Sequence, residues 1–378
     1  MLSSTVEFSP ERDAEIFAAI PAVPAVFLLR GEDAAEPYVS QSANLRRRLQ
    51  RLLAAPEERS RKLNLRERAR RIEYTLTGSD FESRLLLYRS LRTLFPQTYR
   101  KRLRLRPAPL VRLNLDNPWA RAYVTRRIAR LRGRSVYYGP FPSRAAAERF
   151  LNDSLDLFKM RRCDFDLSPD PAFPGCIYSE MKMCLAPCFK GCTDEEYTTE
   201  VGRVRAYLDS DGQSLVGELA AERESASADL AFEAAAAIHA RMEKVEAARG
   251  LLPQIARPLE RVTGVIVQRS AQPDAVALFR LDAGLLSGPI AFSLEQREGK
   301  PVSMEARITE ALAAAPPATS TSAAEVMEHL ALLKHWFYRS SRLGEVFLAD
   351  ERGELPLRRV VRGVSRVFRG EKAAMGDA

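Results

Sequence analysis

All five cysteines of the chain lie in one short segment, and this clustering constrains the fold more than any other feature. The segment, residues 163–192, reads CDFDLSPDPAFPGCIYSEMKMCLAPCFKGC, with 12, 7, 3 and 3 residues between successive cysteines. Thiolates at short spacing with two more distant partners suit a zinc ion or an iron–sulfur cluster, and spacing alone does not name the metal. The prolines and glycines between them oppose helix, so we expect a loop wrapped around its ligands.

Two other interpretations of the cysteines are weaker. Cysteines that pack as small core hydrophobes would be scattered along the chain, and these are not. A disulfide framework is disfavoured because five is odd and the start, MLSSTVEFSPERDAEIF, is acidic and polar rather than a signal sequence. No apolar run approaches the roughly 20 residues that span a bilayer. We therefore expect a cytoplasmic protein with a metal site and no membrane partner.

Three motifs in and around this segment resemble the UvrC family. They are the CLAPC core of the cysteine pattern, the YYGPFPS run at residues 137–143, and a helical FEAAA segment behind it. The resemblance covers about residues 20–300. It implies a 4Fe-4S cluster, with zinc as the alternative, on four ligands: Cys163, Cys176, Cys184 and Cys188. Cys192 has no counterpart in the family pattern, so we interpret it as a spare thiol.

A strongly basic stretch precedes the cysteines. The whole chain has 58 Lys and Arg against 49 Asp and Glu, which is only a mild excess, but residues 100–134 hold twelve basic residues and the single acid Asp116. This excess of basic over acidic residues favours a segment that contacts phosphates over one that is simply exposed to solvent. Tyr137 and Tyr138 could stack on nucleobases, although burial in a turn is more common. The candidate DNA-binding residues are Arg46, Arg47, Arg100, Arg102, Arg104, Arg126 and Arg127.

The first hundred residues predict a hairpin, a helix, a strand and a second helix. PAVPAVFLLR and EPYVS flank a turn, GEDAAE, and NLRRRLQRLLAA then forms an amphipathic helix from Ser42 with a leucine face and a basic side. RIEYTLTG is a strand, and the next helix begins near Ser79, where Glu82 would complete a capping box. This order resembles a GIY-YIG nuclease domain.

In that resemblance, Tyr38 and Arg48 fall on catalytic positions. The signature tripeptides would be residues 25–27 (AVF) and 38–40 (YVS), but residues 85–88 (LLLY) stand where the metal-binding glutamate belongs. Further departures are Phe27, Ser40, Gln41 and Arg100. Phosphodiester hydrolysis needs a held divalent ion, so we predict DNA binding without incision, and a need for Mg or Mn only if the site is active.

Residues 215–245 carry two helical stripes that predict an antiparallel hairpin. Leu215, Leu219, Ala226 and Leu230 form the first stripe, and Phe232, Ala235, Ile238, Met242 and Val245 form the second. An internal spacer is the simple interpretation, but the pattern resembles the UVR motif through which UvrC docks on UvrB. The matching, partner-binding positions are Phe232, Glu233, Ala235 and Ala236, while His239 and Ala240 replace the usual Arg-Asp pair.

The C-terminal part predicts a small β domain followed by helix. VTGVIVQRS, AVALFRLDAGLLSG and PIAFSLEQ form a three-stranded meander whose AG and SG dipeptides mark turns. A flexible link around residues 313–322 leads to the helix EVMEHLALLKHWFYRSSR, and LPLRRVVRGVSRVFRG ends the chain as a basic strand or helix. His329 and His335 do not share a helix face, and we expect neither to be a ligand.

The sequence therefore predicts an α+β multidomain protein. Its units are a GIY-YIG-like domain (1–100), a basic β/α region (101–160), an iron–sulfur loop (161–195), a UVR-like hairpin (200–250), a small β meander (260–300) and a C-terminal helix with a basic tail (320–378). The expected function is that of a UvrC-like DNA-binding accessory or regulatory protein in nucleotide excision repair. The alternatives are an active metal-dependent DNA endonuclease and a zinc-stabilised nucleic-acid-binding protein outside repair.

Overall fold

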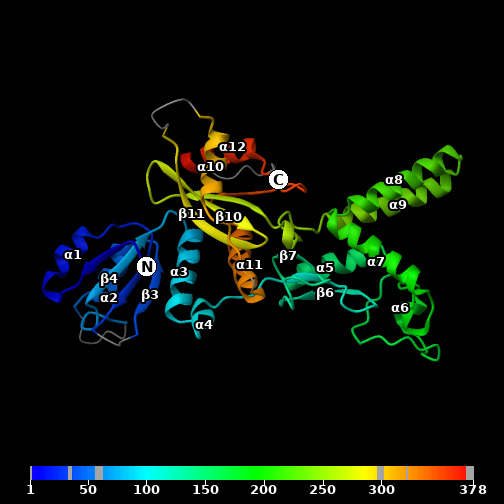
Figure 1. The fold of residues 1–378 in the computed structure, drawn as a ribbon, viewed down its shortest axis with the longest axis horizontal. Coiled ribbons are helices and arrows are strands. Elements are labelled where there is room, and N and C mark those ends of the chain that lie inside the picture. The colour runs from blue at the N-terminus through cyan, green and yellow to red at the C-terminus, as the bar shows by residue number, and fades with distance from the viewer. Residues whose placement is uncertain (1, 33–35, 56–62, 296–301, 321, 372–378) are drawn as a thin grey trace.

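The structure is a computed structural model that describes residues 2–32, 36–55, 63–295, 302–320 and 322–371. Within these residues the chain forms three four-stranded sheets whose strands pair antiparallel. Figure 1 shows the N-terminal sheet beside the C-terminal sheet, and a middle sheet beyond which a helical hairpin projects. The predicted α+β class is confirmed, while the boundaries between the six units stay predictions.

The N-terminal sheet has the strand order β1-β4-β2-β3. Its elements are β1 (Ser4–Glu7), α1 (Asp13–Ala19), β2 (Ala25–Arg30), β3 (Tyr38–Ser42), α2 (Leu45–Leu53) and β4 (Arg71–Leu76). The predicted hairpin is confirmed, since β2 and β3 pair directly; its turn at residues 33–35 lies outside the described part. The sequence did not predict β1 or α1, because a four-residue strand shows little periodicity and its partner β4 lies about 70 positions away.

The amphipathic helix α2 forms as its leucines predict. Leu45, Leu49, Leu52 and Leu53 are all buried, and burial of each leucine contributes roughly 1.5–3 kcal/mol. The helix starts later than expected, because the Asn44 side chain accepts the hydrogen bond from the Arg47 backbone N–H and so forms the N-cap in place of Ser42. Its apolar stripe faces the core shared by α1 and the N-terminal sheet.

Helix α3 (Asp80–Leu94) links the N-terminal sheet to the C-terminal part of the chain. The predicted N-cap is confirmed, since Ser79 Oγ accepts from the Glu82 N–H, but the capping box is incomplete. Glu82 Oε2 accepts at 2.8 Å from the N–H of Gly78, the residue before the N-cap, and not from that of Ser79. Helix α3 packs on β2 and β3 and also on α11 (Ala323–Phe337). The short helix α4 (Tyr99–Leu103) follows.

The middle sheet has the order β6-β5-β7-β8. Its strands are β5 (Leu110–Asn114), β6 (Arg121–Thr125), β7 (Val136–Gly139) and β8 (Arg257–Pro258). Helix α5 (Arg144–Leu155) covers it, and Ser143 is the predicted N-cap. After the cysteine segment, which holds α6 (Ile177–Glu180), come α7 (Asp194–Asp209) and the hairpin of α8 (Gln213–Ala228) and α9 (Phe232–Arg249). The predicted antiparallel hairpin is confirmed and projects from the body in Figure 1.

The C-terminal sheet, of order β11-β10-β9-β12, has helices on both faces. Its strands are β9 (Gly264–Arg269), β10 (Ala275–Asp282), β11 (Leu285–Ser293) and β12 (Glu345–Leu348). Val265 and Val267 face α10 (Met304–Ala314) and α12 (Leu357–Arg369), whereas Ile266 faces α3 and α11. This sandwich explains why β9 reads as a continuous apolar run, because successive side chains on both faces are buried.

One predicted turn in this sheet is wrong. The AG dipeptide does form the turn between β10 and β11, but Ser287 and Gly288 lie inside β11. The β10–β11 register shifts opposite this point, and Gly288 adopts a φ of +109°. A Cβ there would lie 2.8 Å from the Leu278 carbonyl oxygen, so the glycine permits an irregular strand rather than a turn.

The tail helices also differ in detail from the expectation. Helix α11 is not a half-exposed amphipathic helix, because every residue of its stretch 326–333 is buried between the C-terminal sheet and α3. The basic tail forms helix α12 rather than a strand. None of the helices in the described ranges is long and apolar enough to cross a membrane.

Candidate metal centre and nucleic-acid interface

The four candidate ligands lie in one irregular segment, as expected for a loop. Cys163, Cys176 and Cys184 are half-buried, and Cys188 is buried. Burial is the main cause that raises the pKa of the Cys184 thiol, and the charges of the other three cysteines raise it further. Burial, and then the charges of Cys176 and Cys163, raise the pKa of the Cys188 thiol. The four sulfurs therefore share one electrostatic neighbourhood.

Hydrogen-bond donors already point at two of these sulfurs. The Ala186 N–H donates to Cys184 Sγ at 3.1 Å, and Arg161 Nη1 donates to Cys163 Sγ at 3.3 Å. Arg161 is only 1% exposed, and its other contacts are carbonyls, among them Trp119 O at 2.9 Å. Within the described residues no carboxylate pairs with this buried guanidinium. A thiolate at Cys163 would supply the missing negative charge, so the donor set fits a bound soft metal.

The thiols are not arranged as a finished coordination sphere. In the described part of the chain, no three Cys, His, Asp or Glu side chains stand close enough to hold a metal. Binding would thus draw the sulfurs together, and the metal assignment stays a prediction. Cys192 lies beside the same cluster, where burial first, and then Glu196, raise its pKa to about 11.

The two candidate catalytic residues, Tyr38 and Arg48, lie in contact. Arg48 Nη2 donates to Tyr38 Oη at 3.0 Å, which joins α2 to β3. Phe27, which stands for the first signature tyrosine, is fully buried with its ring centroid 6.1 Å from that of Tyr38. It is a core residue of the N-terminal sheet.

The turn of α3 that should carry the metal-binding glutamate packs against another part of the protein. Leu85 and Tyr88 are buried in the core formed with the C-terminal sheet, and Tyr88 Oη donates to Glu328 Oε2 at 2.8 Å. Neither nearby acid is free to replace the glutamate. Glu82 caps its own helix, and Asp80 pairs with Arg339. The Tyr38–Arg48 pair therefore has no carboxylate from this helix.

A buried carboxylate on α11 gathers residues that sequence reasoning did not connect. Glu328, 6% exposed at its side chain, accepts from Tyr99 Oη at 2.7 Å and from Arg100 Nε at 2.6 Å, in addition to Tyr88. Burial and the Glu328 carboxylate raise the pKa of both tyrosines, so both stay protonated donors. No local signal could reveal this network, because its partners lie more than 220 positions apart.

The candidate DNA-binding arginines fall into two groups. Arg46 donates to the backbone carbonyls of Ile20 and Ala18, and Arg102 pairs with Glu36. Arg46 thus helps to hold the fold together, whereas Arg102 makes an exposed surface ion pair. The exposed remainder, besides Arg100, is Arg47 on α2, Arg104 after α4, and Arg126 and Arg127 after β6. Tyr137 and Tyr138 are buried, as expected over base stacking, but they lie in strand β7 rather than in a turn.

The hairpin is packed at its base and bare at its tip. Leu215, Leu219 and Val245 are buried, whereas Leu230 is 71% exposed and Phe232 66% exposed. Leu230 thus leaves the predicted apolar stripe; it adopts a φ of +57° where the chain reverses. Of the other candidate partner-binding residues, Glu233 and Ala236 are exposed and Ala235 is half-buried.

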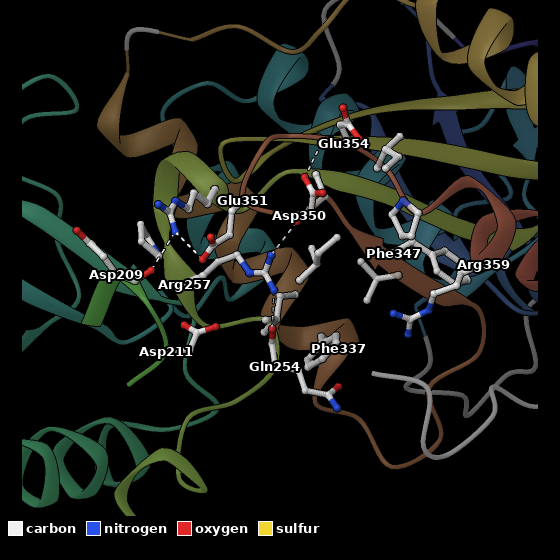
Figure 2. Close-up of a pocket in the computed structure, with 18 residues that line it drawn as sticks. Asp209, Asp211, Gln254, Arg257, Phe337, Phe347, Asp350, Glu351, Glu354 and Arg359 are labelled. Carbon is white, nitrogen blue, oxygen red and sulfur yellow. Dashed lines mark hydrogen bonds and ion pairs between the residues drawn. The ribbon is translucent and has the colours of Figure 1, made fainter. Parts of the chain in front are cut away.

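A cavity of about 590 Å³ lies where the middle and C-terminal sheets meet. Figure 2 shows arginines and acids from both sides pointing into it, among them Arg257, Asp211 and Glu351. Arg261 donates to the Asp209 carbonyl at 2.9 Å and lies 3.8 Å from Glu351, and Arg257 donates to the Ala349 carbonyl. Because the lining holds five acids against three arginines, the cavity suits a junction between the sheets better than a polyanion site.

Comparison with known proteins places the basic stretch and the cysteines in one family region. Residues 109–207 match the family described as UvrC/Cho excinuclease, middle domain. UvrABC system protein C of Idiomarina loihiensis is 31% identical over 222 residues, covering 56% of this chain and 34% of the relative. The Carboxydothermus hydrogenoformans protein of that name is 30% identical over 219 residues, covering 57% and 35%. The Dehalococcoides mccartyi protein, strain BAV1, is 25% identical over 292 residues, covering 75% and 47%.

The chain thus spans between about a third and a half of the length of these curated relatives. No solved structure matches. The resemblance predicted from the motifs is confirmed at the level of similarity: residues 109–207 match the UvrC/Cho middle-domain family, and more than half of the chain is similar to proteins called UvrABC system protein C.

Proposed function

We propose that this protein binds DNA as a UvrC-like component of nucleotide excision repair, in an accessory or regulatory role. The observation that carries the proposal is the match of the UvrC middle domain to residues 109–207, which overlaps the strongly basic stretch 100–134. Arg104, Arg126 and Arg127 are exposed there, and arginine side chains of this kind neutralise phosphates. Few groups beside them suit readout of base edges, so we expect weak sequence preference.

Salt dependence tests the DNA-binding part. Affinity for a labelled duplex, followed by anisotropy, should fall steeply with salt, with a log–log slope of about −0.9 for each phosphate neutralised. Arg126→Ala with Arg127→Ala should make that slope shallower. The matched control, Arg223→Ala with Arg241→Ala, removes the same charge from exposed positions on the hairpin and should leave the slope nearly unchanged. Tight binding to one undamaged sequence with little salt dependence would contradict the proposal.

Incision is the second candidate function, and the Tyr38–Arg48 hydrogen bond is the observation that favours it. This pair can grip a phosphate. However, a divalent ion stabilises the developing charge only where a carboxylate holds it, and loss of a comparable electrostatic group costs about 10² to 10³ in rate. With residues 85–88 packed on the C-terminal core, we propose binding without incision.

A cleavage assay separates the two candidates. Damaged duplex is incubated with the protein and magnesium or manganese, with UvrA and UvrB supplied. We expect no nicking above background. Multiple-turnover nicking that disappears in Tyr38→Phe or Arg48→Ala would establish the enzyme and overturn the accessory role.

For the cysteines we propose a 4Fe-4S cluster held by Cys163, Cys176, Cys184 and Cys188, with zinc as the alternative. The bound group would cross-link the loop, and its binding energy would stabilise the fold of residues 163–188. Support comes from the shared neighbourhood of the four sulfurs and from the buried Arg161 beside Cys163. Anaerobically purified protein should be brown with broad absorption near 400 nm; one zinc per chain without that absorption would favour the alternative.

The exposed tip of the hairpin is the proposed contact with UvrB. Phe232 presents a large apolar side chain to solvent, which is typical of residues that a partner covers. His239 replaces the usual arginine of the motif, so we expect weak affinity for UvrB. The His239 imidazole lies 3.8 Å from the Glu243 carboxylate on the same helix. In a binding assay with the immobilised protein, Phe232→Ala should abolish the retention of UvrB. The control Ala228→Ser, nearby at the end of α8, should retain UvrB as the wild type does.

A further inference from the structure

A second cavity, of about 300 Å³, differs from the first in its charge. It lies between α4, the segment after β6, and α11. Figure 1 shows α11 between α4 and the middle sheet. Most of its lining is apolar, namely Leu105, Pro107, Ile128, Ala323, Met327 and Ala331. Its volume is at the lower end of small-molecule sites, so it can take one small flat group but no folded segment of chain.

The charged lining of this cavity is three arginines and one acid, Glu328, which pairs with Arg100, so a net positive charge remains. Arg126 and Arg127 line it and are exposed, and in the described part of the chain neither is paired with an acid. Arg106 and Lys334 lie close by. Burial first, and then the charges of Arg126 and Arg106, lower the pKa of Lys334. Cations that repel one another around an apolar cavity favour an anionic occupant.

The third arginine of the rim, Arg100, is held rather than mobile. Its Nε donates to Glu328 Oε1 at 2.6 Å and to Tyr99 Oη at 3.2 Å, yet 58% of its side chain remains exposed. A guanidinium fixed at one edge presents its flat face, and such planes stack on unpaired bases. The pocket thus combines an apolar interior, a fixed planar cation and phosphate-binding arginines.

We propose that this pocket receives one unstacked base of a DNA strand, while Arg126 and Arg127 bind the phosphates that flank it. The inference rests on the proposed DNA binding and adds a preference for DNA with an unpaired base. Taking a base out of the stack costs least where the base has no partner, so a bulge or damaged position is favoured over an intact duplex. An uncharged apolar peptide would leave the rim arginines unused.

The test uses the full chain and a duplex with a single unpaired 2-aminopurine, a fluorescent adenine analogue. Wild-type protein should bind this duplex about fivefold more tightly than the fully paired duplex, the lower end of what stacking of one base contributes. Free 2-aminopurine nucleotide lacks the flanking phosphates and should bind far more weakly. Equal affinity for the free nucleotide and the bulged duplex would overturn the proposal in favour of a nucleotide site.

Variants locate the base. Ala324→Leu adds a bulky side chain at an exposed lining position of α11, and Ala313→Leu on α10 is its control away from the pocket. Ala324→Leu should reduce the fivefold preference to about one and leave affinity for the paired duplex unchanged. Ala313→Leu should keep the preference. A preference that survives Ala324→Leu would place the base elsewhere and overturn the assignment.

The rim is tested by a second pair of variants. Arg126→Ala with Arg127→Ala should lower the affinity for both duplexes and remove the preference for the bulged one. Arg130→Ala with Arg132→Ala in the same loop should lower the affinity for both duplexes by the same factor and so keep the preference. Acrylamide quenching of the bound 2-aminopurine gives a readout on wild-type protein, and the base should be shielded. Absence of all DNA binding would refute the proposed function itself, while binding without preference or shielding would refute only the pocket.

Discussion

The buried His329 should make the C-terminal core sensitive to acid. Its side chain is 5% exposed, its Nδ1 accepts the Leu286 N–H at 2.9 Å, and its ring lies edge-on to that of Tyr88. Burial is the main cause that lowers the pKa of His329 to about 4; Arg89 and Arg92 lower it further, while Glu325 and Glu328 oppose the shift. The imidazole is therefore neutral in the folded protein at neutral pH.

The magnitude follows from the difference between the folded and unfolded pKa. The ordinary value is 6.5 and the folded value about 4, so with 1.36 kcal/mol per pKa unit the full effect is about 3 kcal/mol. Between these two values the unfolded chain binds a proton that the folded chain does not. The stabilisation is thus fully present above pH 6.5, is lost as pH falls, and is gone below pH 4. Protonation also removes the acceptor of the Leu286 N–H.

The assay compares wild type with His329→Asn, whose side-chain oxygen can accept the same N–H but does not titrate. Trp119→Phe in both proteins leaves Trp336, the other of the two tryptophans, as the reporter, and it is buried on the same helix. Following one reporter matters, because a chain with several cores need not unfold in one step.

Urea unfolding is then measured from pH 7.5 to pH 4.5. The smaller Asn side chain shifts stability by an amount that does not depend on pH. Below pH 6 wild type should lose stability relative to the variant by up to about 1.4 kcal/mol per pH unit. Parallel pH profiles for the two proteins would refute the reasoning.

Three further outcomes follow. Glu328→Gln removes the charge that accepts from two tyrosines and Arg100, so thermal melts should show a loss of about 2–3 kcal/mol, and an unchanged melting temperature would contradict the network. Gly288→Ala forces a Cβ toward a carbonyl at a φ of +109° and should cost about 1–3 kcal/mol in urea unfolding; a neutral result would show that the strand adjusts. Cys184→Ala should lower metal content measured by elemental analysis, while Cys192→Ala should not; equal loss in both would make Cys192 a ligand.

Local patterns predicted much of the fold, because they depend on neighbours in the chain. The leucines of α2, the N-cap Ser79 of α3, the N-cap Ser143 and the α8–α9 hairpin are all present where spacing predicted them. The missed elements include α7, although Thr193 and Glu196 form a capping box at its start and a local signal was therefore present. Strand β1 has four residues, and α10 follows residues 296–301, outside the described part.

The candidate site was likewise predicted only in part from the sequence. The sequence placed the four cysteines in one loop and singled out Tyr38 and Arg48 as candidate site residues; that these two side chains meet was seen only in the structure. The sequence did not show which arginines are exposed. Arg46 and Arg127 look alike in the sequence, but one binds the carbonyl end of α1 and the other lies on the rim of a pocket.

The sequence by itself determined the cysteine cluster, the basic stretch, the family resemblance and the helices with clear faces, because each of these is written in residues close together. Only the tertiary structure decided the use of α3. Its residues 85–88 read as a lost metal ligand, yet Leu85 and Tyr88 of this turn are buried in the core shared with α11, where Tyr88 meets Glu328 across 240 positions. That contact, and the basic pocket beside it, exist because the C-terminal sheet buries apolar surface against a helix of the N-terminal part, and no local pattern encodes which distant surface a buried face will meet.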